Sequence, residues 1–417
     1  MSENAMSENA THLTPEQVED PVRGYADLRT RDELPHAVLP GLTTPVRLVT
    51  RYADVKAALT EPRLIRDRTR IPGDADEAQA SDAQDELLEA ASAGLPAEYV
   101  KYFAGHLALF DGEEHAHRRA PLTRAFTARR IAALRTFVER TADALVAEAE
   151  ANGGTDLLGA FAYPLATQVI CELIGVEERD RDQVCSWMRD FAFGDGSRAG
   201  EALVALVEYA KELIARRRAE PTEDLISALL DGDQLTEDDL IGIVFLLINT
   251  GITPPALFLA HAALALLDHP EQAARLHAAP ELLPRAVPEL LRYVSIVRIG
   301  ATLYATEDVD FAGTALRRGE SVTVALLAAD HDPEEFGDGA GQLDVGREFG
   351  RGDGHLAFGH GAHYCIGAAL GRLVTSVVLD RLFVRHDGLR LAVPRAELEF
   401  GHWPGDGFHL LRLPVRL

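Results

Sequence analysis

A single cysteine stands in a glycine-rich stretch, residues 358–367, which reads Phe-Gly-His-Gly-Ala-His-Tyr-Cys-Ile-Gly and runs into a helix-forming segment. Cys365 would lie just before that helix, near its positive N-terminal end, which favours a thiolate over a thiol. Gly359, Gly361 and Gly367 permit positive φ angles and let a flat partner approach the backbone closely. A thiolate beside a flat partner is the arrangement in which cysteine binds haem iron.

Two other interpretations of Cys365 are open at this point. A lone cysteine in a loop is most often a structural residue, and a cysteine with a histidine nearby can act as a nucleophile. Neither interpretation accounts for the three glycines. A c-type haem would require a Cys-x-x-Cys-His sequence, which the chain lacks. The pattern Phe-Gly-x-Gly-x-His-x-Cys-x-Gly resembles the cysteine loop of the cytochrome P450 superfamily, in particular that of its soluble bacterial members.

The resemblance extends to basic residues that would hold the haem propionates. His115 and Arg119 lie four positions apart, so on a helix they share a face, and they match the family's His-x-x-x-Arg pair. Arg298 and His355 match two further propionate donors of the family, and His363 occupies the basic position two residues before the cysteine. The resemblance therefore implies haem b with an axial cysteine and this set of cofactor-binding residues: His115, Arg119, Arg298, His355, Phe358, Gly359, His363, Cys365 and Gly367.

Glu289 and Arg292 match the family's Glu-x-x-Arg pair. Three positions apart on a helix, they would meet on one face. By the resemblance the pair is buried and ties its helix to the loop that precedes the cysteine, whereas the spacing alone would also fit a surface ion pair worth less than about 1 kcal/mol.

The central helix departs from the family pattern. Members usually carry Gly-x-Asp/Glu-Thr there, and the acid and the alcohol deliver protons during oxygen activation. Aligned on Gly251, this chain has Thr253 in the acid position and Pro254 in the alcohol position. Asn249, Thr250, Thr253 or a substrate hydroxyl would then bind the water that supplies protons, so these residues and Cys365 are the predicted catalytic groups.

The proline pair in this helix has a backbone consequence. Pro254 and Pro255 cannot donate to the carbonyl groups of Thr250 and Gly251, so we expect a kink at this point.

Three interpretations of the activity follow from the departure. The first is a monooxygenase with a substituted proton path. The second is an atypical member that catalyses coupling, desaturation, rearrangement, nitration or peroxide-driven chemistry, because Thr253-Pro254 replaces the acid–alcohol pair. The third is a haem-binding protein without oxygen chemistry.

Substrate and partners can be predicted only through the resemblance. A small organic molecule, in a role in bacterial secondary metabolism, would occupy a pocket lined by Phe245, Leu246, Asn249, Ile296, Val297, Trp403 and Phe408. The chain has no Rossmann fingerprint and no flavin domain, so electrons would come from ferredoxin and ferredoxin reductase. An acidic ferredoxin would dock on a basic cluster made of His117, Arg118, Arg124, Arg129 and Arg130.

Composition limits the class of protein. A net charge of −25 argues against nucleic-acid binding and for a cytoplasmic location, and three cysteines make no disulfide framework. Residues 240–267 contain no Asp, Glu, Lys or Arg, but polar residues and prolines interrupt the segment, so we expect a buried core helix and not a membrane span.

The elements that must position these residues follow from local patterns. We expect a mainly α fold with small β-sheets, the cytochrome P450 fold, with a long buried central helix over the haem, in a single domain over residues 16–417 of a monomer. Thr236 and Asp239 predict a capping box at the start of the central helix. Strands are expected at residues 301–306, 309–311 and 321–326, and an acidic loop, helical near residues 86–91, at 73–94. Met-Ser-Glu-Asn-Ala occurs twice at the start, so residues 1–15 are expected to be a disordered or non-native N-terminus.

Overall fold

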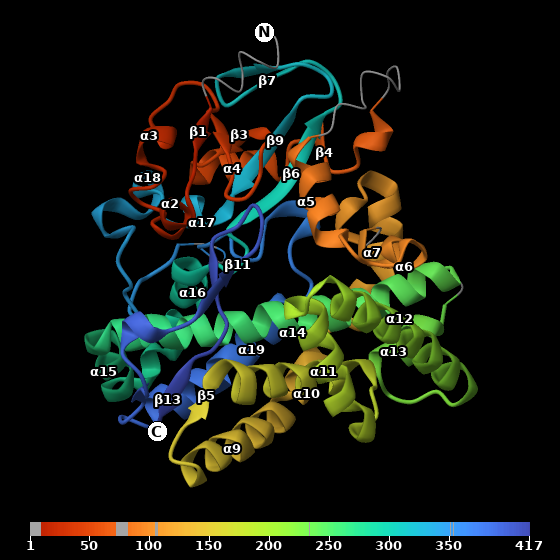
Figure 1. The fold of residues 1–417 in the computed structure, drawn as a ribbon, viewed down its shortest axis with the longest axis vertical. Helices are drawn as coiled ribbons and strands as arrows, with labels where there is room; N and C mark the ends of the chain where they lie inside the picture. Colours follow the sequence, from red (N-terminus) through yellow and green to blue (C-terminus); the bar gives the residue numbers. More distant parts are fainter. Residues whose placement is uncertain (1–9, 72–81, 105–106, 233, 351, 353) are drawn as a thin grey trace. The chain divides into compact units, whose positions relative to one another are not determined.

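The computed structural model describes residues 10–71, 82–104, 107–232, 234–350, 352 and 354–417. The chain forms two compact units from separated segments, and each unit is described by itself (Figure 1). The sheet unit comprises residues 1–91, 288–365 and 400–409, and the helical unit comprises residues 92–287, 366–399 and 410–417. The single domain expected over residues 16–417 stays a prediction.

A six-stranded mixed sheet organises the sheet unit. Its strands, in spatial order, are β1 (Thr11–His12), β2 (His36–Val38), β3 (Pro45–Val49), β9 (Ser321–Ala325), β6 (Ile299–Ala305) and β4 (Leu64–Ile65). Two hairpins accompany it: β7 (Val309–Phe311) with β8 (Thr314–Leu316), and β11 (Phe400–His402) with β12 (Phe408–Leu410). The three predicted strands correspond to β6, β7 and β9. Ala312 and Gly313 turn the first hairpin with φ angles of 47° and 76°, as a tight hairpin turn requires.

Seven helices of the described chain belong wholly or partly to this unit: α2 (Pro15–Glu19), α3 (Ala26–Arg29), α4 (Tyr52–Ala58), α5 (Ala83–Ser92), α16 (Leu283–Val294), α17 (Leu326–Asp330) and α18 (Pro333–Phe336). Tyr52 and Val55 of α4 pack with Val322 and Val324 of β9 in one apolar core. Helix α5 begins at Ala83, earlier than the helical segment predicted near residues 86–91. Residues 72–81 of the predicted acidic loop lie outside the described residues.

The disorder expected over residues 1–15 does not extend to Thr11 and His12. Thr11 and His12 pair in parallel with Ala37 and Val38, so the chain is ordered by the sheet before residue 15. Backbone hydrogen bonding to a neighbouring strand explains the order, because polar side chains do not prevent ladder formation. Residues 1–9, which hold most of the repeated sequence, lie outside the described residues.

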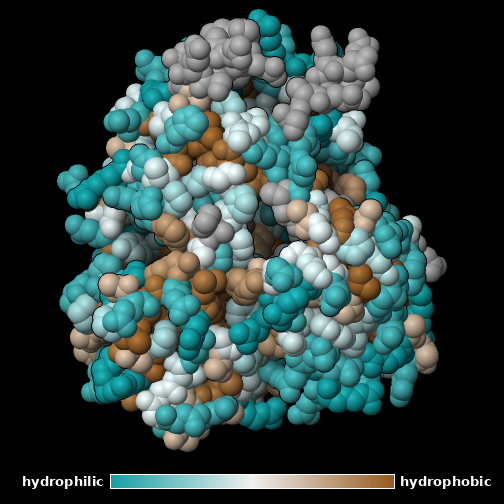
Figure 2. All heavy atoms as spheres, viewed as in Figure 1, coloured by the Kyte–Doolittle hydropathy of each residue, from teal (hydrophilic) through white to brown (hydrophobic). Residues whose placement is uncertain are grey.

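The helical unit contains eleven helices among its described residues: α6 (Ala97–Ala104), α7 (Gly112–Ala125), α8 (Ala128–Ala133), α9 (Arg135–Ala151), α10 (Tyr163–Ile174), α11 (Glu178–Phe193), α12 (Gly196–Ala219), α13 (Leu225–Leu230), α14 (Glu237–Asp268), α15 (Pro270–Ala278) and α19 (Ala368–Leu379). A small sheet of β10 (Arg390–Leu391), β13 (Pro414–Arg416) and β5 (Thr155–Asp156) completes it. Over α12 and α13 the visible surface is mostly hydrophilic, as expected for solvent-facing helices (Figure 2).

Helix α14 is the central element of the helical unit. The predicted capping box is present, because the Thr236 hydroxyl accepts from the Asp239 N–H and the Asp239 carboxylate accepts from the Thr236 N–H. Helix α10 lies alongside α14 (Figure 1). A Cβ on Gly251 would lie 2.6 Å from Cγ1 of Ile170, so a glycine is needed where the two helices meet.

Within the described part of the chain, two segments are long and apolar enough to cross a membrane, namely residues Leu157–Ile174 and helix α14. Buried residues make up 72% and 67% of their most apolar windows, respectively. The predominant burial fits the core helix expected for residues 240–267, since a helix in the middle of a large protein is apolar on all sides.

Candidate functional site

The cysteine loop is a tight turn between Phe358 and Cys365. The Cys365 N–H donates to the Phe358 carbonyl oxygen at 2.9 Å, and the Tyr364 N–H donates to the Gly361 carbonyl oxygen at 3.1 Å. The Phe358 ring meets the Tyr364 ring edge-on, with 6.3 Å between centroids. These contacts hold the backbone around Cys365, which is exposed.

The three cysteines lie in different environments. Cys171 is buried and Cys185 is partly buried, whereas Cys365 is exposed. Burial raises the pKa of the Cys171 thiol to about 12 and also raises the pKa of Cys185. Both groups therefore remain protonated at neutral pH, and a metal-binding thiolate is best placed at Cys365.

The glycines of the loop agree with the prediction in part. Gly359 and Gly361 have φ angles of 69° and 71°, as expected. A Cβ on Gly361 would lie 2.8 Å from the Leu59 carbonyl oxygen, so this glycine also lets the loop pack against the end of α4. The positive φ expected for Gly367 is wrong: it is the N-cap of α19 with a φ of −81°, which any residue adopts at the start of a right-handed helix.

Four of the predicted propionate donors carry side chains that can donate hydrogen bonds to a carboxylate. His115 and Arg119 lie on one helix, α7, with His115 buried and Arg119 partly buried. In the sheet unit, Nδ1 of the buried His355 accepts from the Ala357 N–H at 3.2 Å, which leaves the proton of the neutral ring on Nε2. His363 is partly buried in the cysteine loop. Their role toward a propionate stays a prediction.

Arg298 has partners that the sequence did not reveal. Its Nε lies 2.8 Å from a Glu19 carboxylate oxygen, its Nη1 lies 3.9 Å from Asp406, and its Nη2 donates to the Phe408 carbonyl oxygen at 2.6 Å. The guanidinium therefore already faces two carboxylates. The propionate role of Arg298 stays a prediction. The Glu19 carboxylate would compete with a propionate for the Arg298 guanidinium.

Glu289 and Arg292 form the expected buried ion pair on α16. Arg292 Nε and Nη2 donate to the Glu289 carboxylate at 2.7 and 2.9 Å, and neither side chain is exposed. Arg292 also donates to the carbonyl oxygens of Asp330, Ala340 and Gln342 at 2.7, 2.7 and 3.0 Å. A planar guanidinium suits this use because its donors point in fixed directions.

Glu289 completes the network on its acidic side. Its carboxylate accepts from the Asp344 N–H and from Arg347 Nε, both at 2.9 Å. The pair therefore joins α16 to residues 340–347, the segment that precedes the cysteine loop. Arg347 was not predicted, because no local spacing relates it to Glu289.

The buried His331 gives the network a pH dependence. Burial, with Arg292 nearby, lowers the pKa of His331 to about 3, and its ring Nδ1 lies 3.0 Å from the Leu327 carbonyl oxygen. The unfolded state therefore binds a proton first as the pH falls. We expect the protonation of His331 by itself to lower the free energy of unfolding by about 1.4 kcal/mol for each pH unit below about 6.5, until the folded-state pKa is reached. Burial raises the pKa of the neighbouring Asp330, which acts in the opposite direction in the same range and is common to the parent and the variant below.

Urea titrations between about pH 7 and 5 measure this effect. His331→Asn should flatten the pH dependence, since asparagine keeps a donor near the Leu327 carbonyl and does not titrate. The exposed His277→Asn is the matched control and should retain the slope of the parent. Equal slopes in the parent and His331→Asn would contradict the assignment.

One side of α14 is open although most of the helix is buried. Thr250 is exposed, and Gly242, Leu246 and Pro254 are partly exposed at intervals of four residues, so the four positions share a face. Asn249 is partly exposed beside them. The helix is continuous across its two prolines, so the expected kink does not interrupt it.

The two threonines of this segment lie on different sides. The Thr250 hydroxyl donates to the Leu246 carbonyl oxygen at 2.7 Å, which leaves its lone pairs for a further donor. Thr253 is buried, and its hydroxyl lies beside that of Tyr163 on α10. Neither of these two hydroxyl oxygens has a hydrogen-bond partner of ordinary geometry among the described residues. Asn249 and Thr250 thus occupy the open side of α14, and Thr253 does not.

The predicted pocket residues of α14 divide by helical position. Phe245 is 1% exposed and meets Phe191 of α11 edge-on, with 5.7 Å between centroids. The expectation that Phe245 lines a pocket is corrected to a core position, because its side chain points into the packed helices. Leu246 and Asn249 remain partly exposed.

The predicted pocket residues of the sheet unit keep accessible surface. Ile296, Trp403 and Phe408 are partly exposed, and Val297 is 46% exposed. Val297 follows Ser295, which holds a φ of 31°, an uncommon angle for a residue other than glycine.

Among the described residues, the helical unit has a larger and a smaller pocket. One of about 580 Å³ is lined mainly by polar residues of α10 and α11 and contains none of the predicted site residues. A smaller one, of about 180 Å³, joins Tyr102 of α6 and Arg118 of α7 to Gly242 and Ile243 of α14. The smaller pocket reaches the open side of α14, because Gly242 belongs to that side.

The predicted basic cluster is partly neutralised. Arg118 donates to the Asp239 carboxylate at 2.8 Å, pairs with Glu114 and lies over the Phe110 ring. His117 Nε2 lies 2.9 Å from the Gln234 carbonyl oxygen, and Arg124 donates to the Gln234 side-chain oxygen at 2.6 Å. Arg118 is therefore corrected to an intramolecular role, whereas Arg124, Arg129 and Arg130 form no ion pair with a carboxylate among the described residues.

A cofactor that brings its own metal ligands fits these residues. Among the described residues, no group of three or more His, Cys, Asp or Glu side chains is placed to hold a metal ion. A metal at Cys365 would take its other ligands from a cofactor, as haem iron does. His115, Arg119 and His355 supply donors of the kind that propionates require.

The chain is similar to cytochromes P450 in both sequence and structure. A family model described as Cytochrome P450 matches residues 280–387. Cytochrome P450 107B1 of Saccharopolyspora erythraea is 39% identical over 85% of this chain and 85% of that protein. The 6-deoxyerythronolide B hydroxylase of the same organism is 34% identical over 89% of this chain and 90% of that protein. A solved structure of a mutant of the mixed-function P450 MycG with mycinamicin IV is 32% identical and has a TM-score of 0.83, over 98% of this chain and 100% of that one.

Proposed function

Because this chain belongs to the cytochrome P450 family, whose members are haem-thiolate oxidoreductases, we propose that it binds haem b through the Cys365 thiolate and oxidises a small organic molecule. The observation that carries this proposal is the exposed thiol of Cys365 on a turn whose backbone is fixed by the Phe358 carbonyl. The hydroxylase relatives support a role in bacterial secondary metabolism.

The chain's own residues would divide the work of holding the cofactor. His115 and Arg119 of α7, and His355 and His363 near the cysteine, would donate to the propionates. Phe358, Gly359 and Gly367 would support the loop around the cysteine. When bound, haem would supply the iron at which dioxygen is activated.

Asn249 and Thr250 are the polar groups of α14 that we assign to proton supply. They lie on the open side of the helix, and the Thr250 hydroxyl keeps acceptor capacity for a water. Pro254 leaves the Thr250 carbonyl without a helical donor, so that oxygen can accept a second hydrogen bond from the same water. Such a water would move a proton without the acid–alcohol pair of other family members.

The substrate would contact Leu246 and Asn249 of α14 and the exposed residues Ile296, Val297, Trp403 and Phe408 of the sheet unit. By their names, two relatives act on 6-deoxyerythronolide B and bind mycinamicin IV. An intermediate of secondary metabolism is the substrate class that we propose.

Electrons would come from a ferredoxin reduced by a ferredoxin reductase. Arg124, Arg129 and Arg130 of the helical unit offer cations to an acidic partner, and their attraction would weaken with salt. We place the protein in the cytoplasm as a monomer.

Spectroscopy of the purified protein tests the cofactor. We expect a Soret band and, after reduction under carbon monoxide, the long-wavelength band that a thiolate ligand produces. A spectrum of the histidine-ligated type, or no haem in protein from haem-supplemented cells, would contradict the proposal. Product formed per NAD(P)H consumed, with surrogate redox partners, then separates monooxygenation from the atypical chemistries.

A further inference from the structure

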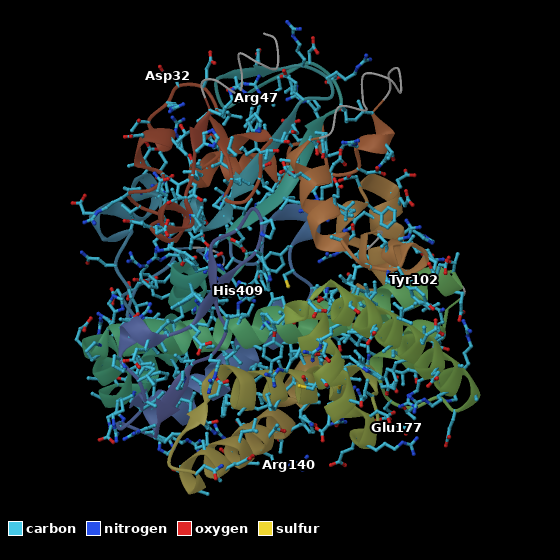
Figure 3. All side chains as sticks on the ribbon, viewed as in Figure 1. Asp32, Arg47, Tyr102, Arg140, Glu177 and His409 are labelled. Carbon is cyan, nitrogen blue, oxygen red and sulfur yellow. The ribbon has the colours of Figure 1, made fainter. Side chains whose placement is uncertain are left out.

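The larger pocket of the helical unit runs along one side of α11. This helix begins after Glu177, which Figure 3 labels, and the pocket follows it from Arg181 to Phe193 at its end. Helix α10, the first turn of α12 and Leu411 complete the lining. The volume of about 580 Å³ falls in the range of small-molecule sites, roughly 300–1,000 Å³. The proposed function leaves this space without a role, since no residue assigned to the haem or the substrate lines it.

The pocket carries exposed apolar side chains. Phe193 is 36% exposed and Leu411 is 41% exposed, and among the described residues Val297 is the one other large hydrophobic side chain with comparable exposure. The Phe193 ring meets the buried Tyr163 ring of α10 edge-on, with 5.9 Å between centroids, which fixes its position. Two exposed apolar groups beside one cavity indicate that the apolar part of a ligand covers them.

A cation stands in the same row of side chains. Cys185, Arg189 and Phe193 follow each other at intervals of four residues, so they share the side of α11 that lines the pocket. Arg189 is exposed and forms no ion pair with a carboxylate among the described residues. Burial raises the pKa of the Cys185 thiol, whereas the neighbouring Thr167 hydroxyl and the Arg189 guanidinium lower it, so the Arg189 charge acts on the interior of the pocket.

The other charges of the pocket do not neutralise Arg189. The lining holds three arginines against two aspartates, which favours an anionic ligand. One of the aspartates, Asp190, pairs with Arg198 of α12. The other, Asp182, lies two helical turns before Arg189, about 10 Å along the axis, which exceeds the Debye length of about 8 Å at physiological salt. Arg189 therefore remains available to an anion from solution.

We infer that this pocket is a second small-molecule site, whose ligand is an amphipathic organic anion. A carboxylate, sulfonate or phosphate group would bind the Arg189 guanidinium, whose donors match the oxygens of such groups, and the apolar part would cover Phe193 and Leu411. Tyr163 separates the pocket from α14, since its ring meets Phe193 and its hydroxyl lies beside that of Thr253. The inference goes beyond the proposed function and does not depend on it.

Calorimetric titration of the haem-loaded protein with anilinonaphthalene sulfonate tests the site. With miconazole on the haem iron to fill the substrate site, we expect one probe molecule to bind per chain, as tightly as without miconazole. Arg189→Gln should weaken this binding about tenfold, because it removes a charge-assisted hydrogen bond. Leu411→Asp should weaken it as well, since it places a carboxylate beside the probe. Arg179→Gln is the matched control, because Arg179 is 74% exposed on the same helix and lies outside the pocket, so this variant should bind the probe as the parent does.

Two further measurements locate the probe and define its chemistry. The probe should slow alkylation of Cys185 by N-ethylmaleimide in proportion to the fraction of protein that holds it, because Cys185 lines the pocket. Mass spectrometry of the peptide that contains Cys185 measures this rate. Phenylnaphthylamine, which has the same rings and no sulfonate, should bind about tenfold more weakly than the anionic probe.

The opposite results would overturn the inference. Loss of binding in the presence of miconazole would place the probe in the substrate site. Equal affinity in the parent and Arg189→Gln, or an unchanged rate of alkylation at Cys185, would remove the probe from the pocket, and equal affinity for phenylnaphthylamine would remove the preference for an anion. Should the parent protein bind no haem, the proposed function fails, while the Arg189→Gln titration and the alkylation of Cys185 still decide the site.

Discussion

Arg292→Ala is expected to yield protein that is strongly destabilised and contains no haem. The variant loses both bonds to Glu289 and three bonds to the carbonyl oxygens of residues 330, 340 and 342. It also leaves the Glu289 carboxylate buried with Arg347 as its remaining cation. Removing one partner of a buried ion pair costs about 3–5 kcal/mol, a large part of the roughly 5–15 kcal/mol that stabilises a typical domain. Urea unfolding and the ratio of Soret to protein absorbance measure the two effects.

Two further variants show whether geometry or charge is responsible. Arg292→Lys keeps the charge but cannot reach five acceptors, so we expect most of the loss to remain. Arg347→Ala removes a more exposed partner of Glu289 and should cost less than Arg292→Ala, because Arg292 still neutralises the carboxylate. Native haem content and an unchanged urea midpoint in Arg292→Ala would contradict the bracing role.

The sequence predicted pairs that are close along a helix and missed partners that are distant. Glu289 and Arg292 could be paired because residues three apart share a helical face. The carbonyl oxygens at residues 330, 340 and 342 could not be named, since backbone acceptors carry no sequence signal. The same limit concealed Glu19 and Asp406, which approach Arg298 through the folding of segments from both ends of the chain.

Helical position explains the corrections along α14. The apolar segment predicted a buried helix correctly. Because the segment is apolar on all sides, its sequence did not show which side of the helix would be open. Phe245 and Leu246 are neighbours, and yet one packs on α11 while the other belongs to the open side. Gly251 lies where α14 meets Ile170 of α10, and the sequence around this glycine carries no signal that identifies the helix packed against it.

Cys365→Ser is expected to remove the thiolate-type carbon monoxide band completely. Serine is close in size, so the turn set by the Phe358 carbonyl and the Cys365 N–H should persist. A hydroxyl remains protonated at neutral pH and does not replace a thiolate as a ligand of iron. The measurement is the reduced carbon monoxide difference spectrum, together with total haem from the pyridine haemochrome.

The other two cysteines make the test specific. Cys171→Ser and Cys185→Ser should keep the thiolate-type band, because burial holds both thiols protonated and away from any ligand role. Cys171→Ser is expected to lower stability, because it places a hydroxyl at a fully buried position. The carbon monoxide spectrum should therefore change in Cys365→Ser, and the free energy of unfolding in Cys171→Ser. Loss of the band in Cys185→Ser with retention in Cys365→Ser would assign the ligand to α11 and remove the cysteine loop from the site. The opposite pattern ties the chemistry to Cys365, the one cysteine whose exposure and glycine-supported turn leave its sulfur accessible to iron.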